Sequence, residues 1–389
     1  METLYQKQKQ LITETSLSFK RYLFDKIPWN SRMVGLTGPR GVGKTTMALQ
    51  YIKEQNNKNL LYVSADDIYF AKNRLLDLVD IFYKDGGKHI FIDEIHKYKN
   101  WSVELKNIYD FYPKLKIFFT GSSVLDIKKG VADLSRRALM FSLYGLSFRE
   151  YLKFCKNVDV PLHSFEEIIN NNISLTDKIE HPLSFFKEYL KNGYYPMATE
   201  DNLDIRLGQI INLTLEIDIP QFSNLSVSTA RKLKQLLVII AESVPFKPNF
   251  SKIAAKLEIS RNSLEEYMTL MEDAGLIARL RAQSSGIIGL GKVDKVYLDN
   301  TNLAFHLADN KSNTGNIRET FFLNQMSVNY KPASSTVADF KIGKYTFEVG
   351  GKNKTQEQIK NTKNAYIIKD DIEYGYKNTV PLWAFGLNY

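Results

Sequence analysis

The residues best suited to chemistry form a glycine-rich segment near the start of the chain. The pattern GxxxxGK[ST] is met by Gly38, Pro39, Arg40, Gly41, Val42, Gly43, Lys44 and Thr45, directly after an apolar run, and Thr46 follows. Glycines here allow backbone N–H groups to approach phosphate oxygens, and the next helix adds its positive N-terminus. The segment predicts a nucleotide site in which Lys44 neutralises the β- and γ-phosphates and Thr45 holds Mg²⁺. A glycine-rich turn without function is the alternative.

Two carboxylates end a second apolar run, His89–Asp93, with Glu94 directly after Asp93. Ligands of parallel α/β sheets bind beyond the carboxyl ends of the strands. We therefore expect Asp93 to complete the Mg²⁺ shell and Glu94 to orient or deprotonate the attacking water. Many strands end in solvated carboxylates, so this interpretation depends on the glycine-rich segment upstream.

A third run, Lys116–Thr120, is followed by Gly121, Ser122 and Ser123. Its hydroxyl groups would lie at the same edge of a parallel sheet, where they could sense the γ-phosphate. A plain Gly-Ser turn is the alternative.

Five β-rich runs separated by helix-length segments must position these residues. The runs are Met33–Thr37, Leu60–Ser64, His89–Asp93, Lys116–Thr120 and Leu139–Tyr144. This alternation indicates βαβ units and a parallel sheet. We expect an α/β domain over residues 1–150, with Glu2–Asp25 as a helix packed against it.

The rest of the chain shows three further patterns. Residues 151–228 have helical spacing and are interpreted as a helical lid. The pattern of residues 229–283 predicts a winged helix. Ser251 is expected to cap a helix over Lys252–Leu257, and Ser260 to cap a second helix over Arg261–Asp273. Gly275 would end the second helix, and a strand would follow over Leu276–Leu280. Residues 284–389 begin with a glycine-rich wing or linker, Ser284–Lys292, and return to mixed α/β.

Composition limits the class of protein. The 389 residues are 44% hydrophobic and 24% charged, which is typical of a globular chain with several domains. The single cysteine, Cys155, excludes an internal disulfide and indicates a cytoplasmic location, and the five histidines lack metal-ligand spacing. We expect neither a signal peptide nor a membrane helix. The net charge of +9 permits polyanion binding without establishing it.

Several segments of the chain resemble those of a known family. The similar segments are Gly38–Thr45, Asp93–Lys97 with Trp101, Thr120–Ser123, Gly193–Pro196, Ala338–Phe340 and Glu348–Lys352. Together they resemble bacterial and archaeal AAA-type P-loop ATPases with a C-terminal nuclease-like domain of unknown function.

The resemblance implies a strand order 5-1-4-3-2, ATP with Mg²⁺ as ligands, and Ser122 or Thr120 as the sensor. It also places Arg136 and Arg137 where related ATPases have an arginine that reaches the γ-phosphate of a neighbouring subunit, and Arg137 is the residue expected in that role. That role requires a homo-oligomer, and a cationic surface pair is the alternative. Gly193–Pro196 resembles a lid turn that touches nucleotide, although a helix break would explain it as well.

The C-terminal segments resemble the core of restriction-type nucleases, with Glu319 on a helix followed by Asp339 and Glu348. Two such carboxylates could hold a second Mg²⁺. The position two residues after Glu348 is Gly350 rather than the lysine of that family, and the nearest lysine is Lys352. An inactive, structural domain is therefore the favoured interpretation unless a Gly-Gly bend returns Lys352 to the site.

Two charge patterns bear on nucleic acid. The expected recognition helix, Arg261–Asp273, carries four acidic residues and one basic residue, so packing against protein is favoured over DNA binding. Between Lys341 and Lys363 there are six lysines and two glutamates, a cluster that could hold nucleic acid or simply be solvated.

Three functions remain open from the sequence. The leading hypothesis is a Mg²⁺-dependent ATPase whose nucleotide state is coupled to the lid and C-terminal domains. The alternatives are a nucleotide-gated switch with little turnover and an ATP-regulated nuclease.

Overall fold

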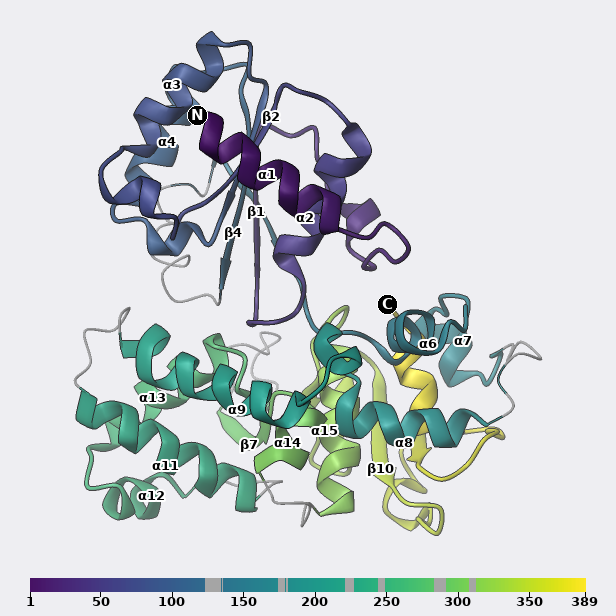
Figure 1. The fold of residues 1–389 in the computed structure, drawn as a ribbon. Coiled ribbons are helices and arrows are strands. Elements are labelled where there is room, and N and C mark those ends of the chain that lie inside the picture. The colour runs from purple at the N-terminus through teal and green to yellow at the C-terminus, as the bar shows by residue number, and fades with distance from the viewer. Residues whose placement is uncertain are drawn as a thin grey trace. The chain divides into compact units, whose positions relative to one another are not determined.

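The structure is a computed structural model that divides into two compact units, Met1–Tyr144 and Gly145–Tyr389 (Figure 1). It describes residues 1–122, 134, 136–173, 179, 181–220, 227–243, 249–282, 292–307 and 313–389. The finer division into lid, winged helix and nuclease-like domain stays a prediction, and each unit is considered by itself.

The N-terminal unit is built on a five-stranded parallel sheet. Its strands are β1 (Met33–Gly38), β2 (Leu60–Ser64), β3 (His89–Asp93), β4 (Lys116–Ser122) and β5 (Leu139–Ser142). Their spatial order is β2-β3-β4-β1-β5, and every neighbouring pair is parallel. Read from the other edge, this is the expected order 5-1-4-3-2, so the α/β fold class is confirmed. The order places the ends of β1 and β3 on either side of β4, where the motif residues follow.

The central strands of this sheet are buried on both faces because helices cover the sheet. Every residue of β1 and β3 is buried, which is typical of parallel strands between helical layers. The long helices are α1 (Glu2–Glu14), α2 (Lys44–Gln55), α3 (Leu75–Lys84) and α4 (Trp101–Phe111). Helix α1 packs against α2 and β2, and α3 packs against α4 (Figure 1).

The first helix is shorter than the sequence suggested. We expected a helix over Glu2–Asp25, but α1 ends at Glu14 because Thr15 adopts an extended conformation. Serine and β-branched threonine are enriched after Ile12, and these residues favour caps and extended chain over helix interiors. Residues between Thr15 and the short 3₁₀ helix Phe24–Lys26 therefore cross the unit as irregular chain.

The C-terminal unit begins with helices. These are α6 (Phe148–Lys156), α7 (Phe165–Ile169), α8 (Pro182–Asn192) and α9 (Leu203–Leu213), followed by a π-helical turn, Thr214–Asp218. Capping boxes fix two of the starts, Ser147 with Glu150 for α6 and Ser164 with Glu167 for α7. Within the described residues, no helix is both long and apolar enough to cross a membrane.

Three helices and a hairpin follow. They are α11 (Val227–Ser243), α12 (Phe250–Lys256), α13 (Arg261–Asp273), β6 (Ile277–Arg281) and the antiparallel β7 (Val293–Leu298). These elements match those expected for a winged helix, although that assignment stays a prediction. Residues 284–291 of the expected wing lie outside the described residues.

One helix cap in this region was predicted wrongly. Ser251 does not cap α12, because the helix begins at Phe250, two residues before the expected Lys252, and the side chain of Asn249 accepts the hydrogen bond from Lys252 N. Asparagine is as strong a cap as serine, so the earlier of the two positions begins the helix. Ser260 does cap α13, and Gly275 follows its end with φ of 72°.

A second sheet closes the chain. Its strands are β8 (Ala333–Ser334), β9 (Phe340–Ile342), β10 (Tyr345–Gly350), β11 (Ala365–Lys369) and β12 (Thr379–Pro381). The order is β12-β11-β10-β9-β8, with β10 to β12 parallel and β8 to β10 antiparallel. Helix α15 (Thr314–Ser327) packs against β10, and α14 (Thr301–Leu307) connects it to β7.

Candidate active site

The glycine-rich segment forms a tight turn between β1 and α2. Gly43 has φ of 95°, a conformation that favours glycine, and it is the residue from which α2 begins. Gly38 is needed because its backbone passes close to the residue that follows β5, and an added Cβ would lie 2.1 Å from the carbonyl oxygen of Leu143. The turn therefore leaves its backbone N–H groups accessible at the start of a helix, which is the geometry for binding phosphate.

Lys44 is held across this turn. Its side chain is buried, and Nζ donates hydrogen bonds to the carbonyl oxygens of Gly38 at 2.9 Å and Pro39 at 3.0 Å. The ammonium group thus lies over the loop rather than in solvent. Thr46, one turn position further, is exposed at the start of α2. The positive charge, the first-turn N–H groups and the helix dipole all favour an anion at this point.

Asp93 connects the loop to β3 and β4. Its Oδ2 accepts hydrogen bonds from Thr45 Oγ1 at 2.6 Å and from the Tyr62 hydroxyl at 2.8 Å, while Oδ1 accepts one from Thr120. The Asp93 side chain is almost completely buried. Both carboxylate oxygens therefore have polar partners, which is what a buried charge requires. The structure thus brings together the expected metal ligands, Thr45 and Asp93, and one of the expected sensors, Thr120.

These oxygens fit Mg²⁺. The ion prefers hard oxygen ligands and usually takes one or two protein groups, with phosphates and water completing its octahedral shell. Thr45 and Asp93 supply a hydroxyl and a carboxylate oxygen next to the phosphate loop. Among the described residues, this site included, no group of three or more His, Cys, Asp or Glu side chains could hold a metal ion.

Glu94 lies directly after β3 in a left-handed conformation, with φ of 50°. Its N–H donates a hydrogen bond to Thr120 Oγ1 at 3.1 Å, so the hydroxyl that donates to Asp93 also fixes the Glu94 backbone. Burial raises the pKa of the Glu94 carboxyl, with Lys44 opposing and Asp93 reinforcing the shift. Glu94 Oε2 also lies 3.2 Å from His96 Nε2. A glutamate with a raised pKa is suited to accept a proton near neutral pH.

The sequence did not predict two contacts of this site, those of Tyr62 and Arg21. Tyr62 was treated only as a strand residue, although a tyrosine in an otherwise apolar buried strand signals a hydroxyl that needs a partner. Arg21 falls within the helix expected over Glu2–Asp25, but it lies in the irregular chain after α1, where it is buried and donates to the carbonyl oxygens of Val42 in the loop and of Tyr144, the latter at 2.8 Å. Nothing in the local sequence around Arg21 indicates that it reaches the loop.

The other expected catalytic residues are less clearly placed. Arg137 donates to both oxygens of Asp110, at 3.0 Å each, and its guanidinium lies over the Tyr109 ring. This two-point ion pair holds the side chain within its own unit, whereas Arg136 is exposed. The backbone of Ser122 ends β4 beside Gly38, but the Ser122 side chain lies outside the described residues, as does Ser123. Both roles remain predictions.

The turn Gly193–Pro196 is anchored inside the C-terminal unit. The side chains of Tyr194 and Tyr195 are both buried, and Tyr194 N donates to Asn302 Oδ1 at 2.8 Å. Asn302 also donates to the carbonyl oxygens at the end of α8, so it caps that helix. Gly193 is required for close packing, because an added Cβ would lie 2.5 Å from the Tyr189 ring. These contacts give the turn a structural role, and its contact with nucleotide stays a prediction.

The C-terminal carboxylates are neutralised by lysines. Lys295 Nζ on β7 donates to Glu319 Oε2 at 3.1 Å and to Asp339 Oδ1 at 3.0 Å. The second oxygen of Asp339 accepts the N–H of Val349 at 3.0 Å. An ammonium group thus lies between the two carboxylates.

Glu348 is paired with a different lysine from the one anticipated. Its Oε1 forms an ion pair with Lys354, whereas Lys352 is exposed. The segment Gly350-Gly351 at the end of β10 therefore returns Lys354 to this strand, two residues later than the expected Lys352. Burial raises the pKa of the Glu348 carboxyl, with the hydrogen bond from Lys354 opposing that shift.

The acidic face of α13 is partly used within the fold. Glu272 accepts hydrogen bonds from Arg279 at 2.7 Å and from Arg281 at 2.9 Å, both on β6. Burial alone would raise the pKa of Glu272, but the hydrogen bonds from the two arginines lower it below its ordinary value. Part of the negative charge that argued against DNA binding therefore stabilises the packing of α13 on the hairpin.

Comparisons with known proteins agree with the N-terminal geometry. The AAA domain family matches residues 30–152, and a domain of unknown function, DUF8612, matches residues 184–314. An uncharacterized protein of Methanocaldococcus jannaschii is 28% identical over 269 residues, which cover 64% of this chain and 56% of that protein. This chain thus spans little more than half the length of its relative.

The structure of AMPPCP-bound DnaA from Aquifex aeolicus aligns with 69% of this chain and 88% of the DnaA chain at 14% identity. The TM-score of this alignment is 0.28, which is too low to support a conclusion about the fold. The fold assignment rests on the strand order and the AAA match. Residues 30–152 are an AAA-type P-loop domain, and the resemblance seen in the sequence is confirmed for this part of the chain.

Proposed function

We propose that this chain, through its AAA-type nucleotide-binding domain, binds ATP with Mg²⁺ and hydrolyses it. The observation that supports this most strongly is the hydrogen bond from Thr45 to Asp93 at 2.6 Å, which joins the phosphate loop to the carboxyl end of β3. It brings together residues 48 positions apart whose roles were inferred separately.

Each residue has a distinct role in this proposal. Lys44 and the first-turn N–H groups of α2 bind the β- and γ-phosphates and favour the charge that develops on them. Bound Mg²⁺, held by Thr45 and Asp93, would neutralise phosphate charge. Glu94 accepts the proton of the attacking water, and its raised pKa suits that task. Thr120 aligns Asp93 and Glu94 through its hydroxyl.

Phosphate release from Mg-ATP tests the proposal. Glu94→Gln should lower turnover by about 10²–10⁴-fold while ATP binding persists, because only the proton acceptor is lost. Lys44→Ala should abolish detectable binding of a fluorescent ATP analogue. Lys58→Ala is the matched control, since Lys58 is exposed and makes no ion pair or hydrogen bond with its side chain among the described residues. Turnover unaffected by Glu94→Gln would contradict the assigned mechanism.

We also propose that hydrolysis involves an oligomer in which a neighbouring subunit supplies Arg136. The exposure of Arg136 and the pairing of Arg137 with Asp110 favour Arg136 over Arg137. Turnover per subunit should rise with protein concentration, and Arg136→Ala should remove that rise. Arg137→Ala serves as the comparison, and a larger loss in that variant would reverse the assignment.

We further propose that the C-terminal domain is structural rather than a nuclease. The ammonium of Lys295 lies between Glu319 and Asp339, and Lys354 pairs with Glu348, so each carboxylate has a cation other than a metal. Incubation with single- and double-stranded DNA or RNA and Mg²⁺ or Mn²⁺ should give no cleavage. Cleavage that is lost in Asp339→Ala would overturn this proposal.

A further inference from the structure

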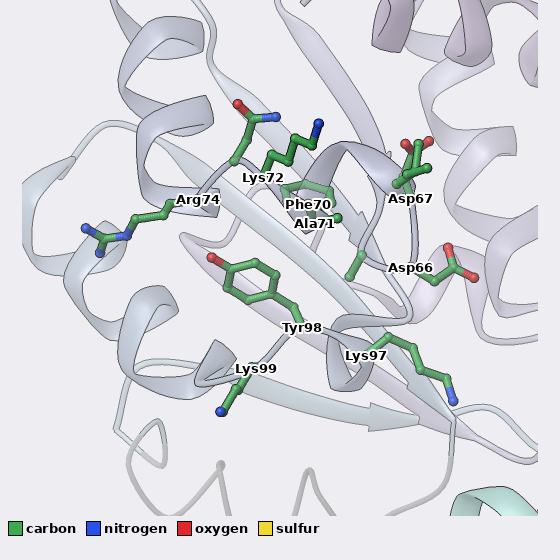
Figure 2. A pocket seen from close by; sticks show the side chains of 12 residues that line it. Asp66, Asp67, Phe70, Ala71, Lys72, Arg74, Lys97, Tyr98 and Lys99 are labelled. Carbon is green, nitrogen blue, oxygen red and sulfur yellow. The ribbon is translucent and has the colours of Figure 1, made fainter.

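A pocket of about 640 Å³ opens on the N-terminal unit beyond the ends of β2 and β3 (Figure 2). Its lining comes from two segments, residues 65–74 after β2 and residues 97–99 after β3. The phosphate loop, residues 38–45, contributes none of these residues. The pocket is therefore separate from the ATP site proposed above, and its volume lies within the range of pockets that hold nucleotide-sized ligands.

Positive charge dominates the lining. Its charged residues are Lys72, Arg74, Lys97, Lys99, Asp66 and Asp67. Asp67 forms an ion pair with Lys7 of α1 and accepts a hydrogen bond from Tyr69 N at 2.9 Å, so its charge is already balanced. Lys72 and Lys99 are exposed, and neither side chain forms a hydrogen bond or ion pair within the described part of the chain. An anion therefore finds two ammonium groups that need not break other contacts to reach it.

Two aromatic rings lie between these cations. Tyr98 is near the middle of the pocket wall in Figure 2, and its ring meets that of Phe70 at a centroid distance of 5.6 Å and an interplanar angle of 74°. The Tyr98 hydroxyl donates to Glu104 at 3.2 Å and accepts from Leu75 N at 3.1 Å. These bonds fix the ring, so a base that stacks on it would lose little side-chain entropy from the protein.

We propose that this pocket binds single-stranded nucleic acid, with backbone phosphates on Lys72 and Lys99 and a base against Tyr98. A cationic surface with a fixed aromatic ring is the combination by which proteins bind single strands without reading their sequence. An acidic peptide would use the lysines but not the ring, and a duplex keeps its bases stacked inside. The binding needs no ATP hydrolysis, so this proposal can be tested and refuted independently of the ATPase proposal.

The full chain and a fluorescein-labelled 12-nucleotide oligo(dT), mixed at 50 mM salt without ATP, provide the test. Fluorescence anisotropy should show saturable binding, and each lysine that contacts a phosphate should contribute about −0.7 to the slope of log affinity against log salt. Lys72→Glu and Lys99→Glu should each weaken binding about tenfold at this salt concentration. The matched control is Lys88→Glu, an exposed lysine at the other end of β3, which should stay within about twofold of wild type.

Four results would overturn the proposal. The first is an absence of saturable binding. The second is binding that survives in the Lys72→Glu/Lys99→Glu double variant, because the nucleic acid would then bind at another surface, such as the C-terminal lysines. Equal competition by poly-glutamate of the same length would show that the ring is not used. Equal competition by AMP or by duplex DNA would identify a free nucleotide or a duplex as the ligand. Circular dichroism of both lysine variants should match wild type, since both side chains are exposed.

Discussion

Lys295→Met tests whether a lysine replaces a metal in the C-terminal cluster. The side chains of Lys295, Glu319 and Asp339 are only 13%, 13% and 17% exposed, and Nζ lies 3.1 and 3.0 Å from the two carboxylates. Methionine keeps the apolar stem of lysine but removes the ammonium, leaving two carboxylates without their shared cation. Loss of one partner from a buried ion pair costs about 3–5 kcal/mol. We expect the free energy of unfolding to fall by that amount at pH 7.

The loss should depend on pH. Burial already raises the pKa of the Glu319 carboxyl, Asp339 raises it further, and Lys295 opposes both. Without Lys295 this pKa rises again, so the folded variant binds more protons than its unfolded chain. Stability of the variant therefore increases as the pH falls from 7 toward 5, by about 1.4 kcal/mol for each unit of the additional shift that is titrated. The difference from wild type should shrink accordingly.

Urea denaturation followed by circular dichroism at pH 7 and pH 5.5 measures both effects. Lys331→Met is the matched control, because Lys331 is exposed in the same unit and its side chain makes no ion pair or hydrogen bond with described residues. We expect this control to change stability by less than about 0.5 kcal/mol. A loss below about 1 kcal/mol in Lys295→Met, or one independent of pH, would refute the reasoning that Lys295 neutralises a buried pair.

Three further predictions concern the active site and a helix cap. ATP turnover should decline on the acid side at a pH above the ordinary glutamate value, because burial raises the pKa of Glu94 and the base must be ionised; a pH–rate profile flat down to about pH 4.3 would contradict this. Tyr62→Phe removes a donor from buried Asp93 and should cost about 1.5–3 kcal/mol in urea titrations, whereas an unchanged midpoint would show that the bond contributes nothing. Ser260→Ala should cost about 1 kcal/mol by loss of its cap. Ser251→Ala should cost less than about 0.5 kcal/mol, and equal losses in the two serine variants would count against the assigned caps.

The sequence predicted those local features of the fold that depend only on residues close together in the chain. The five strands, the start of α2 after the glycine-rich segment, and the Ser260 cap all depend on residues within a few positions of one another. Predictions failed where two local signals competed. Asn249 and Ser251 both have cap-forming side chains, and the sequence does not rank them. The end of α1 at Glu14 was not predicted, although Thr13, Thr15 and Ser16 are weak helix formers.

The sequence by itself determined the phosphate loop and the carboxylates at the end of β3, because both motifs are contiguous and their spacing carries the chemistry. Only the tertiary structure decided which side chains meet across the sheet. It placed Tyr62 and Thr120 on Asp93 and Lys295 between Glu319 and Asp339. These partners are distant in sequence, and their contacts follow from strand order and register rather than from any local pattern. Buried charges must find partners, but the fold selects which ones.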